Sequence, residues 1–141
     1  MPNDITIAHD FSVAPELVFA ALDDHANMGS WLGGKVTLAK RAADGGVGTV
    51  RRIHLGVTHF DEEVIERQVP SRIVYRISRG IPFLRHHRGE ISVEPHGQGG
   101  TRVRWNVAFE STIPGVSGPF RSGLGLVLKQ GLRRLDRRLA R

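Results

Sequence analysis

The sequence contains no cysteine among its 141 residues, so disulfide bonds and thiolate chemistry are excluded. This composition suits a reducing compartment, where disulfides are rare. No apolar run approaches the roughly 18 residues that a membrane-spanning helix requires. The first residues, MPNDITIAHDF, also lack the basic and then apolar order of a secretory signal. We therefore expect a cytoplasmic protein.

The signatures of nucleotide and metal chemistry are missing too. The chain has no GxxxxGKS/T phosphate loop, no GxGxxG turn between a strand and a helix, and no nucleophile elbow. Seven histidines are present, but His86 and His87 are adjacent and the others lack the paired spacing of zinc ligands. We therefore predict neither a cofactor nor a metal site.

The composition is otherwise that of an ordinary globular protein. Apolar residues make up 40% of the chain and charged residues 24%, which argues against intrinsic disorder. A chain of this length buries roughly two thirds of its unfolded surface when it folds around a single core. The sequence shows no linker, repeat or low-complexity segment, so we predict one domain over residues 1–141.

The net charge is +6, from 20 basic and 14 acidic residues, which raises the question of an anionic partner. Seven of the basic residues, and only one acid, Asp136, fall within residues 118–141 on the polar side of an amphipathic pattern. A solvated helix face is the plainer interpretation. No aromatic residues alternate with these basic ones, as a surface for single-stranded nucleic acid requires, so we do not expect nucleic acid. Contact with an anionic membrane stays open, as does the choice between monomer and homodimer.

Residues 118–141 carry the longest helical pattern in the chain. Apolar side chains recur there at steps of three and four residues: Phe120, Leu124, Val127, Leu128, Leu132, Leu135 and Leu139. This spacing predicts an amphipathic helix of about six turns. Glycines at 123, 125 and 131 lie inside it, where each costs about 1 kcal/mol relative to alanine. They indicate either close approach of a neighbouring element or room for a ligand.

The preceding residues predict an antiparallel sheet. Residues 5–11 alternate as a half-buried strand, and two short helices are expected between Pro15 and Gly33. Six further strands are expected at residues 35–40, 48–55, 58–67, 72–78, 87–94 and 101–110. The last alternates most cleanly, with Thr101, Val103, Trp105, Val107 and Phe109 on one face.

Several stretches resemble a known family. They are residues 13–19 (VAPELVF) followed by Leu22, Asp24 and Trp31, residues 48–51 (GTVR), 62–64 (EEV), 70–75 (PSRIVY) and 100–105 (GTRVRW). Together with the order of elements, they resemble the helix-grip fold of the START-like (SRPBCC) superfamily, and within it the polyketide cyclase/dehydrase and lipid-transport branch. The resemblance implies an α+β fold, with a curved antiparallel sheet of about seven strands around the C-terminal helix and two short helices after the first strand.

The resemblance also implies a cavity for small hydrophobic molecules between the sheet and the helix. Combined with the inward positions of the strands, it predicts these ligand contacts: Trp31, Arg51, Phe60, Tyr75, Ile91, Trp105, Phe109, Phe120, Leu124 and Leu128. Leu132, Leu135 and Leu139 are expected to be plain core.

Three inward residues are candidates for acid–base chemistry: Glu62, Tyr75 and His87. Each also has a structural interpretation. Tyr75 suits a core aromatic whose hydroxyl is hydrogen-bonded, Glu62 suits a cross-strand pair with an arginine, and His87 begins a strand, where exposure at the end of the sheet is expected.

Three classes of function follow from these features. The first is a binding module for a small hydrophobic ligand, such as a lipid, a polyketide-like molecule or an aromatic compound. The second is a cyclase or dehydratase that uses Glu62, Tyr75 and His87. The third is an interaction module whose basic helix face contacts RNA, a membrane or a protein. The sequence carries no recognisable catalytic motif that decides among them.

Overall fold

A seven-stranded antiparallel sheet and one long helix make up most of the computed structural model, which describes residues 3–141. The first half of the chain forms β1 (Asn3–Phe11), α1 (Pro15–Leu22), the 3-10 turn η1 (His25–Asn27), α2 (Met28–Leu32), β2 (Lys35–Lys40), the 3-10 turn η2 (Ala43–Gly45) and β3 (Val50–Leu55). The second half forms β4 (Thr58–Gln68), β5 (Arg72–Arg79), β6 (Leu84–His96), β7 (Gly100–Ser111) and α3 (Ser117–Leu139).

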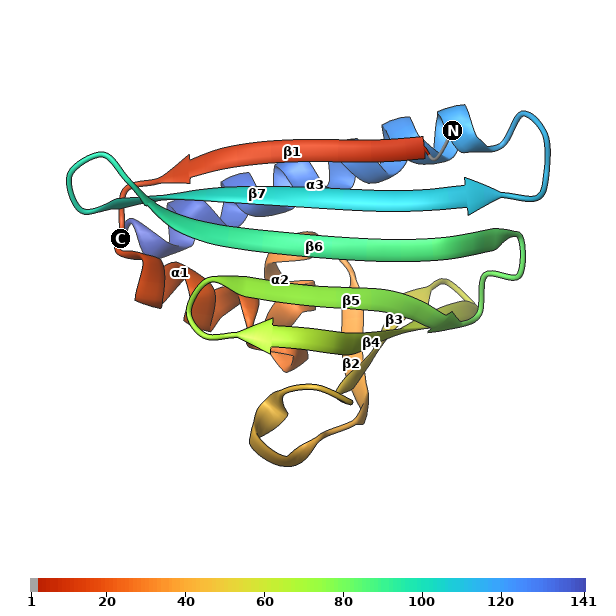
Figure 1. Cartoon of the computed structure of the whole chain (residues 1–141), viewed down its shortest axis with the longest axis horizontal. Helices are drawn as coiled ribbons and strands as arrows, with labels where there is room; N and C mark the ends of the chain where they lie inside the picture. The colour runs from red at the N-terminus through yellow and green to blue at the C-terminus, as the bar shows by residue number, and fades with distance from the viewer. Residues whose placement is uncertain (1–2) are drawn as a thin grey trace.

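The sheet order is β1-β7-β6-β5-β4-β3-β2, with every neighbouring pair antiparallel. Hairpins connect the six consecutive strands β2 to β7, and β1 pairs with β7 at the opposite edge from β2. The long helix α3 lies behind the sheet in Figure 1, and α1 and α2 lie beside its C-terminal half. This arrangement confirms the predicted α+β helix-grip fold.

The predicted elements match the observed ones closely. The largest difference is at β6, which begins at Leu84 rather than at residue 87. The single-domain prediction over residues 1–141 stays a prediction, and Met1 and Pro2 lie outside the described residues. None of the helices within residues 3–141 combines the length and the hydropathy needed to cross a membrane.

Strand β7, which lies between β1 and β6, supplies a large part of the core. Its five predicted inward side chains are all buried, whereas Arg104 and Asn106, on the other face, are exposed. Trp105 and Phe109 are fully buried beneath α3. A shift of one residue would bring arginines into this core, so the alternation fixes the register.

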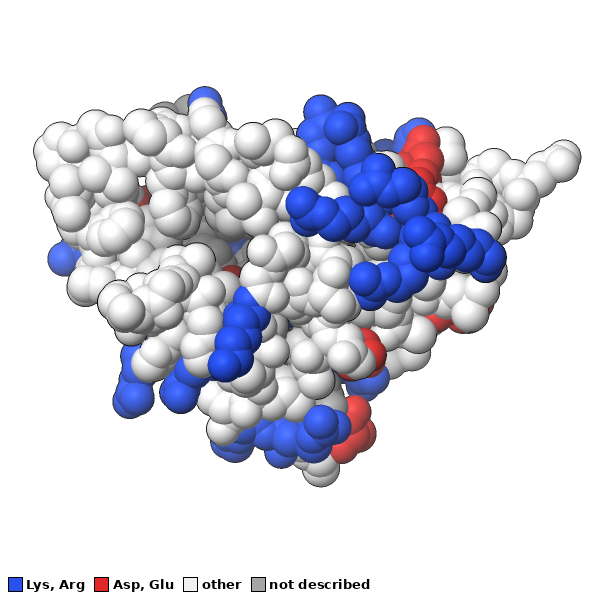
Figure 2. Space-filling model, turned by 180° about the vertical axis from the view of Figure 1, so that it is seen from behind, with Lys and Arg blue, Asp and Glu red and all other residues white. Residues whose placement is uncertain are grey.

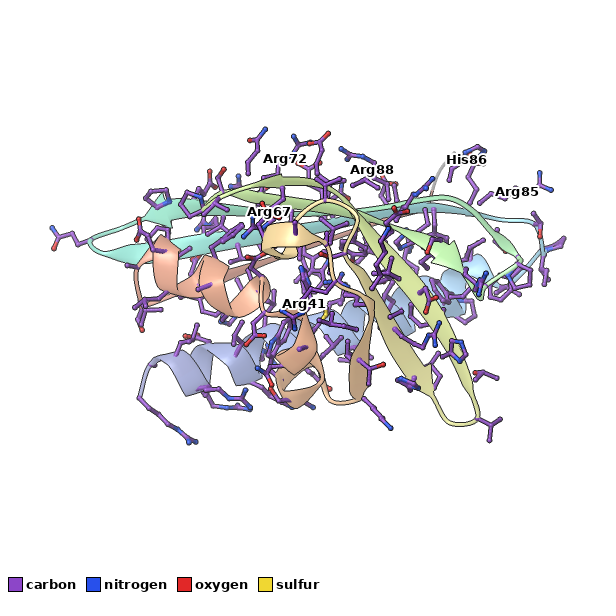
Figure 3. The ribbon with its side chains drawn as sticks, turned by 90° about the horizontal axis from the view of Figure 1, so that it is seen from below. Arg41, Arg67, Arg72, Arg85, His86 and Arg88 are labelled. Atoms are coloured by element: carbon purple, nitrogen blue, oxygen red, sulfur yellow. The ribbon has the colours of Figure 1, made fainter. Side chains whose placement is uncertain are left out.

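Opposite charges face each other on the outer side of the sheet. The cross-strand pairs include Arg52 with Asp61, Arg72 with Glu66 and Glu90, and Arg104 with Glu94, and Arg88 pairs with Glu90 on the same strand. Figure 3 shows Arg72 and Arg88 on the side of the sheet that faces away from α3. The outer face is therefore charged but close to electrically balanced.

The excess positive charge belongs to the C-terminal segment. Residues 117–141 hold seven basic and one acidic residue and so carry the whole net charge of +6, while the 13 basic and 13 acidic residues elsewhere balance. Figure 2 shows the resulting basic cluster over the C-terminal half of α3.

Two arginines of this cluster have structural partners. Arg134 donates to the carbonyl oxygens of Trp31 and Leu32, and Arg138 donates to the carbonyl and hydroxyl oxygens of Ser30. These arginines satisfy carbonyls at the end of α2 that have no partner within the helix.

Two glycines of α3 have different surroundings. A Cβ at residue 131 would lie 3.0 Å from Leu32 Cδ1 and 3.3 Å from Trp31 Cε3, so Gly131 allows α2 and α3 to approach closely. A Cβ at residue 123 would meet no atom within 4 Å. Gly123 therefore leaves open space beside the N-terminal half of the helix.

Candidate ligand-binding cavity

A cavity of about 330 Å³ lies between the inner face of the sheet and the N-terminal half of α3. Strands β3 to β7 and helix α2 form the rest of its wall. The floor is buried, with Trp105 and Leu128 at 0% and 3% exposure, whereas Leu55 and Val127 at the opposite end are 58% and 44% exposed. Figure 2, seen from the α3 side, shows a hollow on this face of the molecule. The cavity thus runs from the core toward the surface.

The lining is apolar except for three side chains, those of Glu62, Tyr75 and His87. These are the three acid–base candidates identified from the sequence, and the structure brings them to one wall. Glu62 lies diagonally from Tyr75 across β4 and β5, because Glu62 pairs with Ile77 and Tyr75 pairs with Val64. This two-residue offset includes the register shift between Val64 and Glu66, because the pairing of Gln68 with Arg72, continued without a shift, would place Glu62 opposite Ser78.

The predicted ligand contacts divide into two groups. Those that line the cavity are Phe60, Tyr75, Trp105, Phe120, Leu124 and Leu128. Four others, Trp31, Arg51, Ile91 and Phe109, are buried behind the lining. Trp31 packs against Trp105 with ring centroids 6.2 Å apart, and Phe109 packs against Phe120 at 5.1 Å. These four side chains support the wall of the cavity, and whether they influence a ligand stays a prediction.

Several other residues line the cavity but are not among the ligand contacts predicted from the sequence. They include Ile53 and Leu55 on β3, Ile77 on β5, and Met28 and Leu32 on α2. The strand residues share the inward parity of Arg51 and Tyr75, so period-two alternation could have identified them. No sequence pattern identifies Met28 and Leu32, because their place depends on how α2 packs against α3.

A buried ion pair lies next to the cavity. Arg51 on β3 and Glu62 on β4 are direct cross-strand partners, and Arg51 Nε donates to Glu62 Oε1 at 2.7 Å. The Arg51 side chain is 1% exposed, and its guanidinium carbon lies 4.4 Å from the centre of the Tyr75 ring. Arg51 therefore gains both an ionic and a cation–π partner in a place where an unpaired charge would be costly.

His25 completes this buried group from the opposite side. Its Nδ1 accepts a hydrogen bond from Arg51 Nη1 at 3.1 Å, which places the ring proton on Nε2, 3.8 Å from Asp23 Oδ1. Burial and the nearby charge of Arg51 lower the pKa of His25 to about 4. Neither spacing nor periodicity marks His25 in the sequence, since it lies 26 residues from the arginine it contacts.

Tyr75 has a hydrogen-bonded hydroxyl, as its structural interpretation requires. Trp105 Nε1 donates to the tyrosine oxygen at 2.8 Å. Burial raises the pKa of the Tyr75 hydroxyl well above its usual value, and the charge of Glu62 raises it further. The ring lies directly over Gly89 on β6, where a Cβ would overlap the phenol. Glycine is thus required at position 89 to accommodate the tyrosine.

His87 is partly buried at the cavity wall, so the expected exposure at the end of the sheet is wrong for this residue. The pairing of β6 with β7 shifts register between Arg85 and Arg88, and His86 has a φ of 53°. This irregularity turns His86 outward, with a side chain that is 77% exposed, and His87 inward. Ile77 N–H donates to His87 Nδ1 at 3.0 Å, and burial together with Arg51 lowers the pKa of His87 to about 4.

Metal binding has no support in the arrangement of these groups. Within the described part of the chain, no three histidine, aspartate or glutamate side chains lie together as a set of metal ligands. The polar groups of the cavity are instead suited to hydrogen bonding inside a mostly apolar space.

The Arg51–Glu62 pair provides a first test of the site. We expect Arg51→Met to lower the free energy of unfolding by about 3 kcal/mol, because it leaves the Glu62 charge uncompensated. The double variant Arg51→Met/Glu62→Leu should recover to within about 1 kcal/mol of the wild type, since no buried charge remains. Urea denaturation measures all three values.

The matched control for this test is Arg76→Met. Its partner Glu63 follows Glu62 on β4, but the Arg76 side chain is 56% exposed, so this pair is open to solvent. Its loss should cost at most about 1 kcal/mol. A double variant as unstable as the single Arg51→Met would contradict the assignment.

The two buried histidines predict a pH dependence of stability. Their folded pKa values of about 4 lie below the ordinary value of 6.5, so the unfolded chain binds more protons between these limits. The free energy of unfolding should be highest above about pH 6.5 and fall toward pH 4, by at most about 1.4 kcal/mol per pH unit for each histidine. Urea denaturation between pH 7.5 and 4.5 measures the slope. His25→Asn and His87→Leu should each reduce it, and a flat wild-type profile would refute the prediction.

Solved structures from three bacteria share this fold. A protein from Thermobifida fusca aligns over 96% of this chain and 92% of its own, with a TM-score of 0.82 and 23% identity. A START superfamily protein from Mycobacterium smegmatis aligns over 96% and 95%, with a TM-score of 0.78 and 15% identity. A protein from Thermus thermophilus aligns over 97% of both chains, with a TM-score of 0.76 and 21% identity. At these identities the likeness concerns the fold alone.

No curated protein matches the chain in sequence. The model of one protein family, described as polyketide cyclase / dehydrase and lipid transport, matches residues 3–140. This match covers nearly the whole chain, from β1 to the end of α3, and it agrees with the START-like fold. The chain therefore belongs to the polyketide cyclase/dehydrase and lipid-transport family.

Proposed function

We propose that the protein binds a small hydrophobic molecule in the cavity between the sheet and α3. The observation that carries the proposal is the cavity itself, about 330 Å³ in volume and apolar except for three side chains. Sites for small molecules commonly combine such a lining with a few polar groups that orient the ligand. Lipids, polyketide-like molecules and aromatic compounds each have an apolar body that suits this lining. The family description, which names polyketides and lipid transport, is consistent with such ligands.

The packing of α3 supports this proposal. Leu132 and Leu135 in the C-terminal half are fully buried, as a plain core requires. In the N-terminal half, Gly123 leaves space where another residue would place a side chain, and Val127 remains 44% exposed. Filling this space with a ligand would remove apolar surface from water at about 25 cal/mol per Å².

An enzymatic function is the second candidate, because Glu62, Tyr75 and His87 meet at one wall. The protonation behaviour of two of them favours binding over catalysis. An efficient acid or base has a pKa near the working pH, yet burial lowers the pKa of His87 to about 4 and raises that of Tyr75. Both groups are therefore better suited to holding a ligand by hydrogen bonds than to exchanging protons with it near pH 7.

Filling the cavity tests the binding function. Gly123→Trp places a large side chain beside the mouth and should weaken binding of the fluorescent probe N-phenyl-1-naphthylamine at least about tenfold, because the probe loses the space it would occupy. Gly118→Trp is the matched control, since residue 118 is also an uncrowded glycine of α3 but does not line the cavity. Fluorescence titration gives the dissociation constants. Failure of the wild type to bind the probe, together with native mass spectra that show no co-purified ligand, would count against the proposal.

The enzymatic alternative predicts a different outcome. If a screen of cyclisation, dehydration and hydrolysis substrates finds turnover, Tyr75→Phe and Glu62→Gln should each reduce kcat by about tenfold or more. Steady-state rates measured with probe binding on the same samples separate loss of chemistry from loss of binding. Unchanged rates in both variants would remove these residues as acid–base groups.

A further inference from the structure

The polar groups of the cavity identify the chemistry of the ligand that the proposed function requires. Tyr75 accepts a hydrogen bond from Trp105 Nε1, which leaves its own hydroxyl proton available. Within residues 3–141, no protein group accepts that proton. The hydroxyl is thus a free donor in a cavity that is otherwise almost entirely apolar.

His87 supplies a second donor beside the first. Because its Nδ1 accepts from the backbone of Ile77, the neutral ring carries its proton on Nε2. His87 lies on β6 and Tyr75 on the neighbouring strand β5, with ring centroids 5.7 Å apart. Both side chains line the same cavity, and a single carbonyl oxygen, which has two lone pairs, can accept a hydrogen bond from each of them.

The charges around these donors favour a neutral oxygen over an anionic one. Arg51 is the cation beside these donors, and it pairs with Glu62 Oε1 and donates to His25. Its Nη2 has no hydrogen-bond partner within residues 3–141, but this atom is buried and Arg51 does not line the cavity. The carboxylate of Glu62 also lines the cavity, so an anionic ligand would meet a negative charge there without a free cation to balance it.

We propose that the ligand is an apolar molecule with a neutral carbonyl oxygen, as in a ketone or an ester, and that this oxygen accepts hydrogen bonds from Tyr75 Oη and His87 Nε2. The apolar body of the ligand then lies along Phe120, Leu124 and Leu128. This inference rests on the proposed function, since it describes the occupant of the same cavity. It excludes free fatty acids and other carboxylates as preferred ligands.

Three naphthalenes of similar shape test the proposal. They are 2-acetylnaphthalene, which has the carbonyl, 2-isopropylnaphthalene, which lacks it, and 2-naphthoate, which replaces it with a charged group. Competition against N-phenyl-1-naphthylamine gives the three affinities. In the wild type, 2-naphthoate should bind more weakly than the ketone. The decisive quantity is the ratio of ketone affinity to hydrocarbon affinity, compared between variants. The two ligands differ in hydrophobicity, but this difference is the same for every variant and does not change the comparison.

Tyr75→Phe and His87→Leu should each lower this ratio by about 3- to 10-fold, the effect of losing one hydrogen bond. Phe60→Leu is the control, because it changes an apolar part of the lining and should leave the ratio unchanged. Tyr75→Phe also leaves the buried Trp105 N–H without a partner, so thermal unfolding is measured in parallel. The ratio does not depend on the folded fraction, and His87→Leu keeps the Tyr75–Trp105 bond.

The outcomes separate the two proposals. If the wild type binds neither the probe nor any of the naphthalenes, the proposed function itself fails. If all of them bind but the ratio stays the same in Tyr75→Phe and His87→Leu, the carbonyl inference is overturned while the binding function stands. Tighter binding of 2-naphthoate than of 2-acetylnaphthalene would overturn the inference as well.

Discussion

The contact between α3 and the inner face of the sheet is the interaction on which the rest of the structure depends. A single sheet of this kind has a buried face that needs a cover, and an amphipathic helix needs an apolar surface. Leu128, Leu132 and Leu135 meet this need along the C-terminal half of α3. Arg134 and Arg138 fix α2 to the same half through its terminal carbonyls. The N-terminal half contacts the sheet through Phe120, which packs on Phe109, and borders the cavity with Gly123 and Leu124.

The buried polar groups determine what that cavity can accept. Arg51 pairs with Glu62 and donates to His25 behind the wall, and the Arg51 side chain does not itself line the cavity, which limits the positive charge available to a ligand. Tyr75 and His87 remain as neutral donors. A cavity with balanced charge and neutral donors favours retention of an uncharged molecule, and the displaced pKa values of both donors make proton transfer near neutral pH less effective. Binding and catalysis are thus distinguished by electrostatics rather than by the shape of the site.

Surface charge is distributed unevenly between the sheet and the C-terminal segment. The outer face of the sheet pairs its arginines with carboxylates, while the entire net charge resides in the segment that contains α3. Part of that charge has a structural role at the end of α2, so a high isoelectric point is weaker evidence for an anionic partner than the composition suggests. The remaining basic residues of α3 form a solvated helix face, which is the plainer of the two sequence-based interpretations.

The amino-acid sequence is sufficient to predict the elements whose signals are local. Alternation fixed the inward face of β7, three- and four-residue spacing identified α3, and Pro15 marked the start of α1. These features depend on residues close together in the chain, whose periods of 2 and 3.6 are properties of the backbone. The same alternation predicted inward positions for Glu62 and Tyr75, and the register shift between Val64 and Glu66 brings the two residues to one face.

Which inward residues border empty space depends on the tertiary structure. Tyr75 lines the cavity, whereas Ile91 is buried behind the lining. Gly131 allows α2 to pack closely on α3, whereas Gly123 borders open space. The tertiary structure also turns His87 inward through an irregular register and joins Arg51 to His25. These outcomes depend on how segments distant in sequence pack together, and local periodicity carries no information about that packing.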